Sequence, residues 1–157
     1  MPATAFATIY RRGQSFFITS SDQTTVGLWV HSGSVERVDG VDAETIGSAL
    51  MRQLDRSTLG VPHPRQDEWT AQRRKALDPI IALAKVRSWR SFIRDATLAS
   101  VERDGDTIRI TPEQSQRIDV FTPLTEREQE LLSPSEVELG AATLAAVAAE
   151  PFDDDRT

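Results

Sequence analysis

Cysteine is absent from the 157 residues of the chain, and histidine occurs only at His31 and His63. The lack of cysteine excludes disulfide bonds, thiol nucleophiles and zinc sites built on thiolates. Neither histidine has a second ligand at helical spacing, so the sequence predicts no metal site and no cofactor. A chain without cysteine is also compatible with a reducing compartment.

The sequence motifs of the common catalytic sites are missing as well. There is no G-x-S-x-G nucleophile elbow, no glycine-rich phosphate loop and no dinucleotide fingerprint. Carboxylates cluster at residues 67–68, 102–106 and 126–130, but these segments are polar and rich in turns, where a carboxylate stays solvated. We therefore expect no enzyme. A small hydrolase with an unrecognised carboxylate pair is an alternative that a ligand-sized pocket holding carboxylates of raised pKa would favour.

Long apolar runs are absent too. No stretch approaches the roughly 20 apolar residues that a membrane helix needs, and residues 1–10 do not have the pattern of a signal peptide. The sequence thus predicts a cytoplasmic protein without a membrane partner. Its length suits a single domain, which we place at residues 1–150, followed by an acidic tail at 151–157 that we expect to be disordered.

Acidic residues outnumber basic ones and are unevenly spread. The net charge is −6, and residues 97–157 hold 14 acidic and 5 basic residues, whereas residues 1–96 hold 10 acidic and 13 basic ones. An acidic surface repels phosphate backbones and attracts basic partners. Residues 65–94 combine eight basic residues with Trp69 and Trp89, a pattern found in nucleic-acid-binding proteins. Trp89 shares a helical face with Phe92, however, which favours its burial.

The residues that are present predict an α+β fold. Strand-like segments, rich in β-branched and aromatic residues, are residues 6–10, 15–19, 26–31, 97–103 and 107–111. Glycine turns are expected between them, at residues 32–34 and at Asp104–Gly105 among others. Asp42 is a suitable N-cap for one helix, and residues 133–136 begin another with a capping box whose first helical residue is Pro134. Pro79 is expected in the first turn of a short middle helix.

The two long helices have similar sequences. Residues 42–49 and 135–142 share a cap, an apolar residue, a glycine and an alanine at equivalent positions. This repeat predicts two antiparallel strands-then-helix halves joined by a short helical middle segment. Because glycine inside a helix costs about 1 kcal/mol, we expect Gly47 and Gly140 to allow close packing of each helix on its sheet. The duplication is similar to the Whirly fold, and a Whirly-like module that binds single-stranded nucleic acid is the alternative function.

Six short segments occur in a fixed order along most of the chain. They are residues 9–16, 27–30, 46–47, 60–64, 86–92 and 138–140. Taken together, this ordered set resembles the immunity proteins of bacterial contact-dependent growth inhibition systems. The resemblance implies a cytoplasmic protein that binds and neutralises the C-terminal toxin domain of a cognate cell-surface effector. Such toxins are often nucleases with a basic cleft, to which an acidic inhibitor is complementary.

The residues that carry the resemblance are mostly packing positions, among them Trp29 and Phe92. Toxin contacts are therefore sought among the acidic and aromatic residues that we expect to be exposed, since these are common anchors of protein interfaces. The candidates are Asp67, Glu68, Trp69, Glu102, Asp104 and Asp106.

Overall fold

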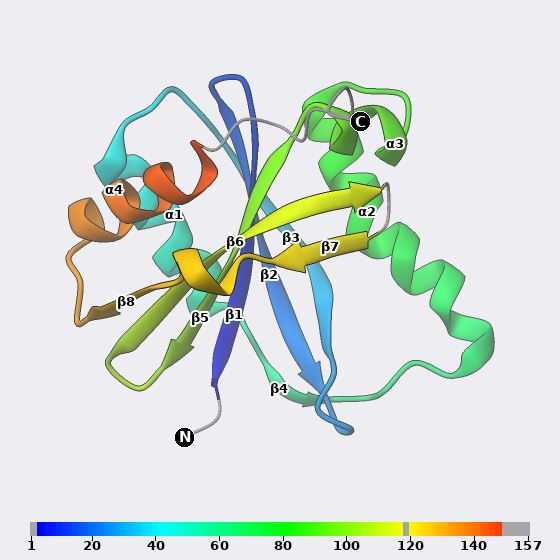
Figure 1. Cartoon of the computed structure of the whole chain (residues 1–157). Helices are drawn as coiled ribbons and strands as arrows, with labels where there is room; N and C mark the ends of the chain where they lie inside the picture. The colour runs from blue at the N-terminus through cyan, green and yellow to red at the C-terminus, as the bar shows by residue number, and fades with distance from the viewer. Residues whose placement is uncertain (1–2, 118–119, 149–157) are drawn as a thin grey trace.

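The computed structural model describes residues 3–117 and 120–148, and in this part of the chain eight strands form one sheet between two layers of helices (Figure 1). The main path of the sheet has the order β3-β2-β1-β5-β6-β7; β4 pairs with β2, and β8 pairs with β6. The strands are β1 (Ala5–Arg12), β2 (Ser15–Thr24), β3 (Trp29–Asp39), β4 (Leu59–Val61), β5 (Thr97–Asp104), β6 (Thr107–Arg117), β7 (Val120–Pro123) and β8 (Gln129–Leu132). The helices are α1 (Ala43–Asp55), α2 (Trp69–Ala84), α3 (Trp89–Arg94) and α4 (Glu136–Val147), with 3-10 turns η1 (Gln66–Glu68) and η2 (Thr125–Arg127).

The α+β class and the strands-then-helix order of each half are confirmed. The first half is β1-β2-β3-α1 and the second is β5-β6-β7-β8-α4, with α2 and α3 between them. The comparison with the Whirly fold suggested a separate sheet for each half, and this was wrong. Strands β1 and β5 pair antiparallel, with Phe6 opposite Glu102 and Tyr10 opposite Leu98, so both halves share one sheet. The expected tail at 151–157 lies outside the described residues.

One face of the sheet is covered by α1 and α4, which lie side by side (Figure 1). Their buried residues recur every three or four positions and pack on the small and branched side chains of β1, β5 and β6. The two helical glycines mark the contact between the helices. A Cβ atom on Gly47 would collide with the backbone carbonyl of Glu136, and one on Gly140 with that of Ala43. The glycines thus serve close packing of helix on helix, and the expected packing on the sheet was wrong.

The other face carries α2 and α3 and is lined by aromatic side chains. Phe92 of α3 is fully buried, and its ring lies within 5.2–5.6 Å of the rings of Tyr10, Phe17 and Trp89. This confirms the expected helical face of Trp89 and Phe92. Helix α2 is tied to β3, where Gln72 donates to the carbonyl of His31 at 3.0 Å.

The predicted strand at 26–31 is confirmed only for residues 29–31, and the predicted turn at 32–34 was wrong. The chain turns earlier, where the amide of Gly27 donates to the carbonyl of Thr24, so Val26 is 68% exposed and β3 runs on through Gly33. Gly33 has φ +92° where the register between β2 and β3 shifts, and a Cβ atom there would lie 3.2 Å from the carbonyl oxygen of Lys75 on α2. The same glycine signal therefore marked a contact between a strand and a helix.

Two helix starts also differ from the prediction. Helix α2 begins at Trp69, so Pro79 lies in its interior and leaves the carbonyl of Lys75, four residues earlier, without its helical donor. Helix α4 is capped by Ser135, whose hydroxyl accepts from the amide of Glu138 at 3.1 Å and donates to its carboxylate. The N-cap is therefore two residues later than predicted, and Pro134 precedes the helix. None of the helices in residues 3–117 and 120–148 has the length and apolarity of a bilayer-spanning segment.

Candidate functional site

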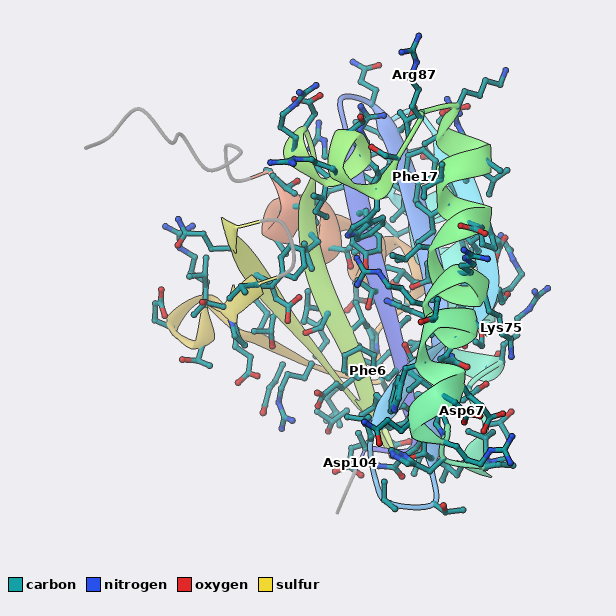
Figure 2. All side chains as sticks on the ribbon, turned by 90° about the vertical axis from the view of Figure 1, so that its right-hand side faces the viewer. Phe6, Phe17, Asp67, Lys75, Arg87 and Asp104 are labelled. Atoms are coloured by element: carbon teal, nitrogen blue, oxygen red, sulfur yellow. The ribbon has the colours of Figure 1, made fainter. Side chains whose placement is uncertain are left out.

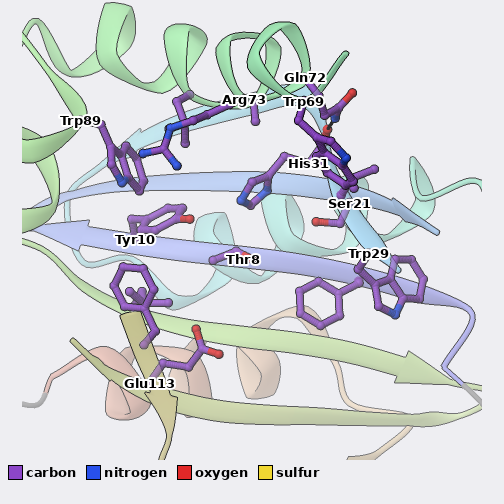
Figure 3. Close-up of a pocket in the computed structure, with 16 residues that line it drawn as sticks. Thr8, Tyr10, Ser21, Trp29, His31, Trp69, Gln72, Arg73, Trp89 and Glu113 are labelled. Carbon is purple, nitrogen blue, oxygen red and sulfur yellow. Dashed lines mark hydrogen bonds between the residues drawn. The ribbon is translucent and has the colours of Figure 1, made fainter. Parts of the chain in front are cut away.

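A cavity of about 580 Å³ lies between α2 and the face of the sheet that it covers (Figure 3). Its aromatic lining consists of Phe6, Tyr10, Trp29, Trp69, Trp89 and Phe121, and its polar lining includes Thr8, Ser21, His31, Gln72, Arg73 and Glu113. Apolar walls with a few converging polar groups are typical of binding sites.

The walls of the cavity follow from the periodicity of each element. Phe6, Thr8 and Tyr10 project from the same side of β1, because side chains alternate along a strand. Trp69 and Arg73 are one helical turn apart on α2, which places both on the side that faces the sheet. Two of the rings contact each other: Trp29 stacks on Phe6 with 5.5 Å between the ring centroids.

Three titratable groups in the cavity have shifted pKa values. Burial lowers the pKa of His31, so its ring is neutral at pH 7, and Thr19 lies within hydrogen-bond distance of its Nδ1 at 3.3 Å. Burial raises the pKa of Glu113. Burial also raises the pKa of Tyr10, and the nearby charge of Glu113 adds to this shift. The cavity therefore disfavours charge on its own side chains.

This cavity meets the condition set for the hydrolase alternative only in part. Among the described residues that line it, Glu113 is the single carboxylate, whereas that alternative requires a pair. In residues 3–117 and 120–148, no three acidic or histidine side chains are grouped so that they could hold a metal ion. The arrangement suits binding through aromatic contacts and one partly buried carboxylate.

An acidic row continues from the cavity along the same face of the sheet. We define the acidic row as Glu102, Glu128 and Glu130, which surround the guanidinium of Arg109 at 3.5, 3.4 and 3.0 Å. The register places Phe6 opposite Glu102, Glu102 opposite Arg109, and Arg109 opposite Glu130. An aromatic wall of the cavity and the acidic row are therefore neighbours on adjacent strands.

The acidic row is accessible to a partner. The side chains of Arg109 and Glu130 are 38% and 59% exposed. Their mutual contacts raise the pKa of Arg109, chiefly through its hydrogen bond with Glu130. With three carboxylates around one guanidinium, the row keeps an excess of negative charge.

The structure separates the candidate contact residues into three places. Trp69 lines the cavity, and Glu102 belongs to the acidic row. Asp67 and Glu68 lie in η1, before α2, and both pair with Arg65, whose Nε is 3.6 and 3.0 Å from their carboxylates. Asp67 lies at the same end of the molecule as Asp104 (Figure 2), but the β5–β6 turn and the start of α2 are on opposite sides (Figure 1).

Asp104 and Asp106 flank the β5–β6 turn, as predicted, at the end of the hairpin away from the cavity residue Glu113. Sequence reasoning missed Glu113 and Arg109 altogether. A signal for both was present, because polar residues alternate with Ile108 and Ile110 along β6. Such alternation indicates that one face of the strand is polar while the other is buried.

The comparisons with known proteins bear on this geometry. A family model described as CDI immunity protein matches residues 5–149. The chain belongs to this family. No curated protein matches the chain.

Two solved structures share the fold of this CDI immunity protein. One is the protein of unknown function NMB0488 from Neisseria meningitidis, with a TM-score of 0.78 and 12% identity over 92% of this chain and 93% of that chain. The other comes from the CdiA-CT/CdiI toxin and immunity complex of Yersinia pseudotuberculosis, with a TM-score of 0.74 and 15% identity over 94% of this chain and 97% of that chain. At these identities the likeness concerns the fold.

Proposed function

We propose that this chain binds and neutralises the C-terminal toxin domain of a cognate contact-dependent growth inhibition effector in the cytoplasm. The observation that carries the proposal is the match to the CDI immunity family across residues 5–149. A structural neighbour that comes from a toxin and immunity complex supports it. The protein acts by occupying a surface of the toxin, without a chemical step of its own.

We further propose that the toxin, a basic nuclease domain, contacts the face of the sheet that holds the cavity and the acidic row. Two of the sequence candidates, Trp69 and Glu102, lie on this face. Aromatic anchors beside a charged rim are typical of protein interfaces, and the excess of negative charge in the row would speed encounter with a basic partner. The negative field would then be extended, at the end of the molecule away from Glu113, by the other four candidates: Asp67, Glu68, Asp104 and Asp106.

The test is binding of the toxin domain encoded immediately upstream, measured by surface plasmon resonance at several salt concentrations. We expect a one-to-one complex whose association rate falls as salt rises. The double variant Glu102→Gln/Glu130→Gln should slow association by about 3- to 10-fold with a smaller change in dissociation. The matched control is Glu44→Gln/Glu136→Gln, which removes two exposed charges from the α1–α4 face and should leave the rate within about 2-fold of wild type.

Two results would count against this proposal. If the wild-type protein forms no complex with the neighbouring toxin domain, the neutralising function is wrong. If the control variant slows association as much as the variant of the acidic row, net charge alone attracts the toxin, and the assignment of this face is wrong.

A further inference from the structure

We infer that the cavity receives an arginine side chain of the toxin domain, whose guanidinium pairs with the carboxylate of Glu113. This inference rests on the proposed function and adds to it the chemistry of one contact. Three observations carry it: the position of Glu113, the aromatic walls around it and the charge of the adjacent surface.

Glu113 occupies a position where a carboxylate is costly. It projects from β6 into the cavity, next to Leu98 in the register, and its side chain is partly buried. No hydrogen bond or ion pair joins its carboxylate to another side chain in the described part of the chain. A buried carboxylate ordinarily has a cation or several hydrogen-bond donors, because desolvation without compensation is unfavourable. Since the described residues supply no such group, we infer that a partner does.

Arg73 does not fill that role within the chain. It reaches the cavity from α2, on the side opposite Glu113 (Figure 3), and its charge is not among the causes of the pKa shift of Glu113. Burial raises the pKa of Glu113, and no cation of the described residues offsets this shift. The charge of the Glu113 carboxylate acts on Tyr10, whose pKa it helps to raise. Within residues 3–117 and 120–148, the carboxylate therefore lies beside a neutral phenol and has no counter-ion.

The walls around Glu113 favour a flat cation. Tyr10 has its ring 5.5 Å from that of Trp89, and both line the cavity together with Phe121. A guanidinium stacks on aromatic faces and offers two parallel donors to a carboxylate. A lysine ammonium has neither property and loses more hydration on entry, so arginine is the better match. Arginine is also among the residues that most often dominate the binding energy of interfaces.

The adjacent surface would guide a cation to the cavity. Along β6, Arg109, Thr111 and Glu113 share one face, and the Thr111 hydroxyl donates to Glu128 of the acidic row at 3.0 Å. Glu128 of the acidic row is thus bonded to Thr111, which lies two residues from Glu113 on the same face of β6. Complementary charge at the rim and a desolvated charge at the centre are the arrangement that gives both rapid encounter and slow dissociation.

The first experiment compares dissociation of the toxin domain from the wild-type protein and from Glu113→Gln. The amide keeps the shape of the side chain but loses its charge. We expect dissociation to become about 10- to 100-fold faster, with little change in association. Glu44→Gln, exposed on α1 at the opposite face, is the control and should dissociate like the wild type. Thermal unfolding of Glu113→Gln should show no loss of stability, because a structural ion pair is not being broken.

The second experiment needs no toxin. N-acetyl-arginine amide is titrated into the full chain, and the indole resonance of Trp89 is followed by NMR; N-acetyl-citrulline amide, a neutral analogue of similar shape, is the control. We expect saturable millimolar binding of the arginine amide to the wild type, at least about 5-fold weaker binding to Glu113→Gln, and no saturation with citrulline.

The outcomes separate this inference from the proposed function. If the wild type binds the toxin domain and Glu113→Gln dissociates equally slowly, the arginine contact is overturned while the neutralising function stands. If no toxin binds, both statements about the toxin fail, and the amide titration alone decides whether the cavity is a cation site. Equal binding of arginine and citrulline amides would overturn the pairing with Glu113.

Discussion

The two faces of the sheet are built from the same strands but differ in what covers them. On the α1–α4 face, apolar side chains such as Ile9, Val101 and Ile110 are fully buried under two helices in backbone contact. The residues that alternate with these along the strands point to the α2–α3 face. They include Tyr10 and Glu113, and a cavity of about 580 Å³ remains there. The first face carries most of the apolar burial, whereas the second keeps space and polar groups.

This difference indicates how the fold divides stability from recognition. Close packing leaves little freedom to change a side chain, since added or removed volume is felt at once. A cavity with partly exposed polar groups tolerates such changes at low cost and can match a particular partner. Substitutions on the α1–α4 face should therefore lower the stability, and those on the α2–α3 face should alter binding.

The largest effect on stability is expected from Gly140→Ala, which tests whether the α1–α4 face serves stability alone. The added methyl group would collide with the backbone carbonyl of Ala43, and backbone atoms cannot move aside as a flexible side chain can. We expect the free energy of unfolding to fall by about 3 kcal/mol, as measured by urea denaturation. The toxin affinity of the protein that remains folded should not change. Ala141→Ser, one residue further and exposed, adds one atom and should cost less than about 0.5 kcal/mol.

A smaller effect tests whether the two halves are equivalent in energy as well as in sequence. Asp42 caps α1 by accepting from the amide and the hydroxyl of Thr45, and Ser135 caps α4 by accepting from the amide of Glu138. Replacing either cap by alanine should lower the free energy of unfolding by about 1 kcal/mol. The loss should be larger for Asp42→Ala, because a carboxylate also interacts with the positive end of the helix dipole. Equal losses in urea denaturation would contradict this ranking.

The sequence alone was sufficient for the elements that local chemistry determines. The Asp42 cap, the Asp104–Gly105 turn and the repeated helix pattern were all predicted, because each depends on neighbours in the chain. The roles of Gly33 and Gly47 were missed, since a glycine does not reveal which distant segment approaches it. Glu113 was missed for a similar reason: its cavity is assembled from β1, β2, β3, β5, β6, β7, α2 and α3, and no single segment displays it.

The smallest expected effect concerns Glu113 and pH. Burial raises the pKa of this carboxyl in the folded protein above its ordinary value of 4.5, so the folded state holds the proton more tightly than the unfolded chain does. The associated stability is present below pH 4.5 and is lost as the pH rises through the raised pKa. Glu113→Gln does not titrate, so it should match the wild type in acid and exceed its stability at pH 7.

Thermal unfolding of both proteins between pH 4 and 8 measures this difference. His31, which also lines the cavity, titrates in both proteins and its effect largely cancels. Tyr10, whose pKa burial raises further, keeps its proton throughout this range. Glu126→Gln, which also removes an exposed carboxyl, is the control and should follow the wild type across the range, because Glu126 lies on the folded surface outside the α-helices. A Glu113→Gln variant less stable than the wild type at pH 7 would mean that the carboxylate holds the fold together. Glu113 would then stabilise the fold, as the residues of the α1–α4 face do, although it lies on the other face. The division of stability and recognition between the two faces would not hold.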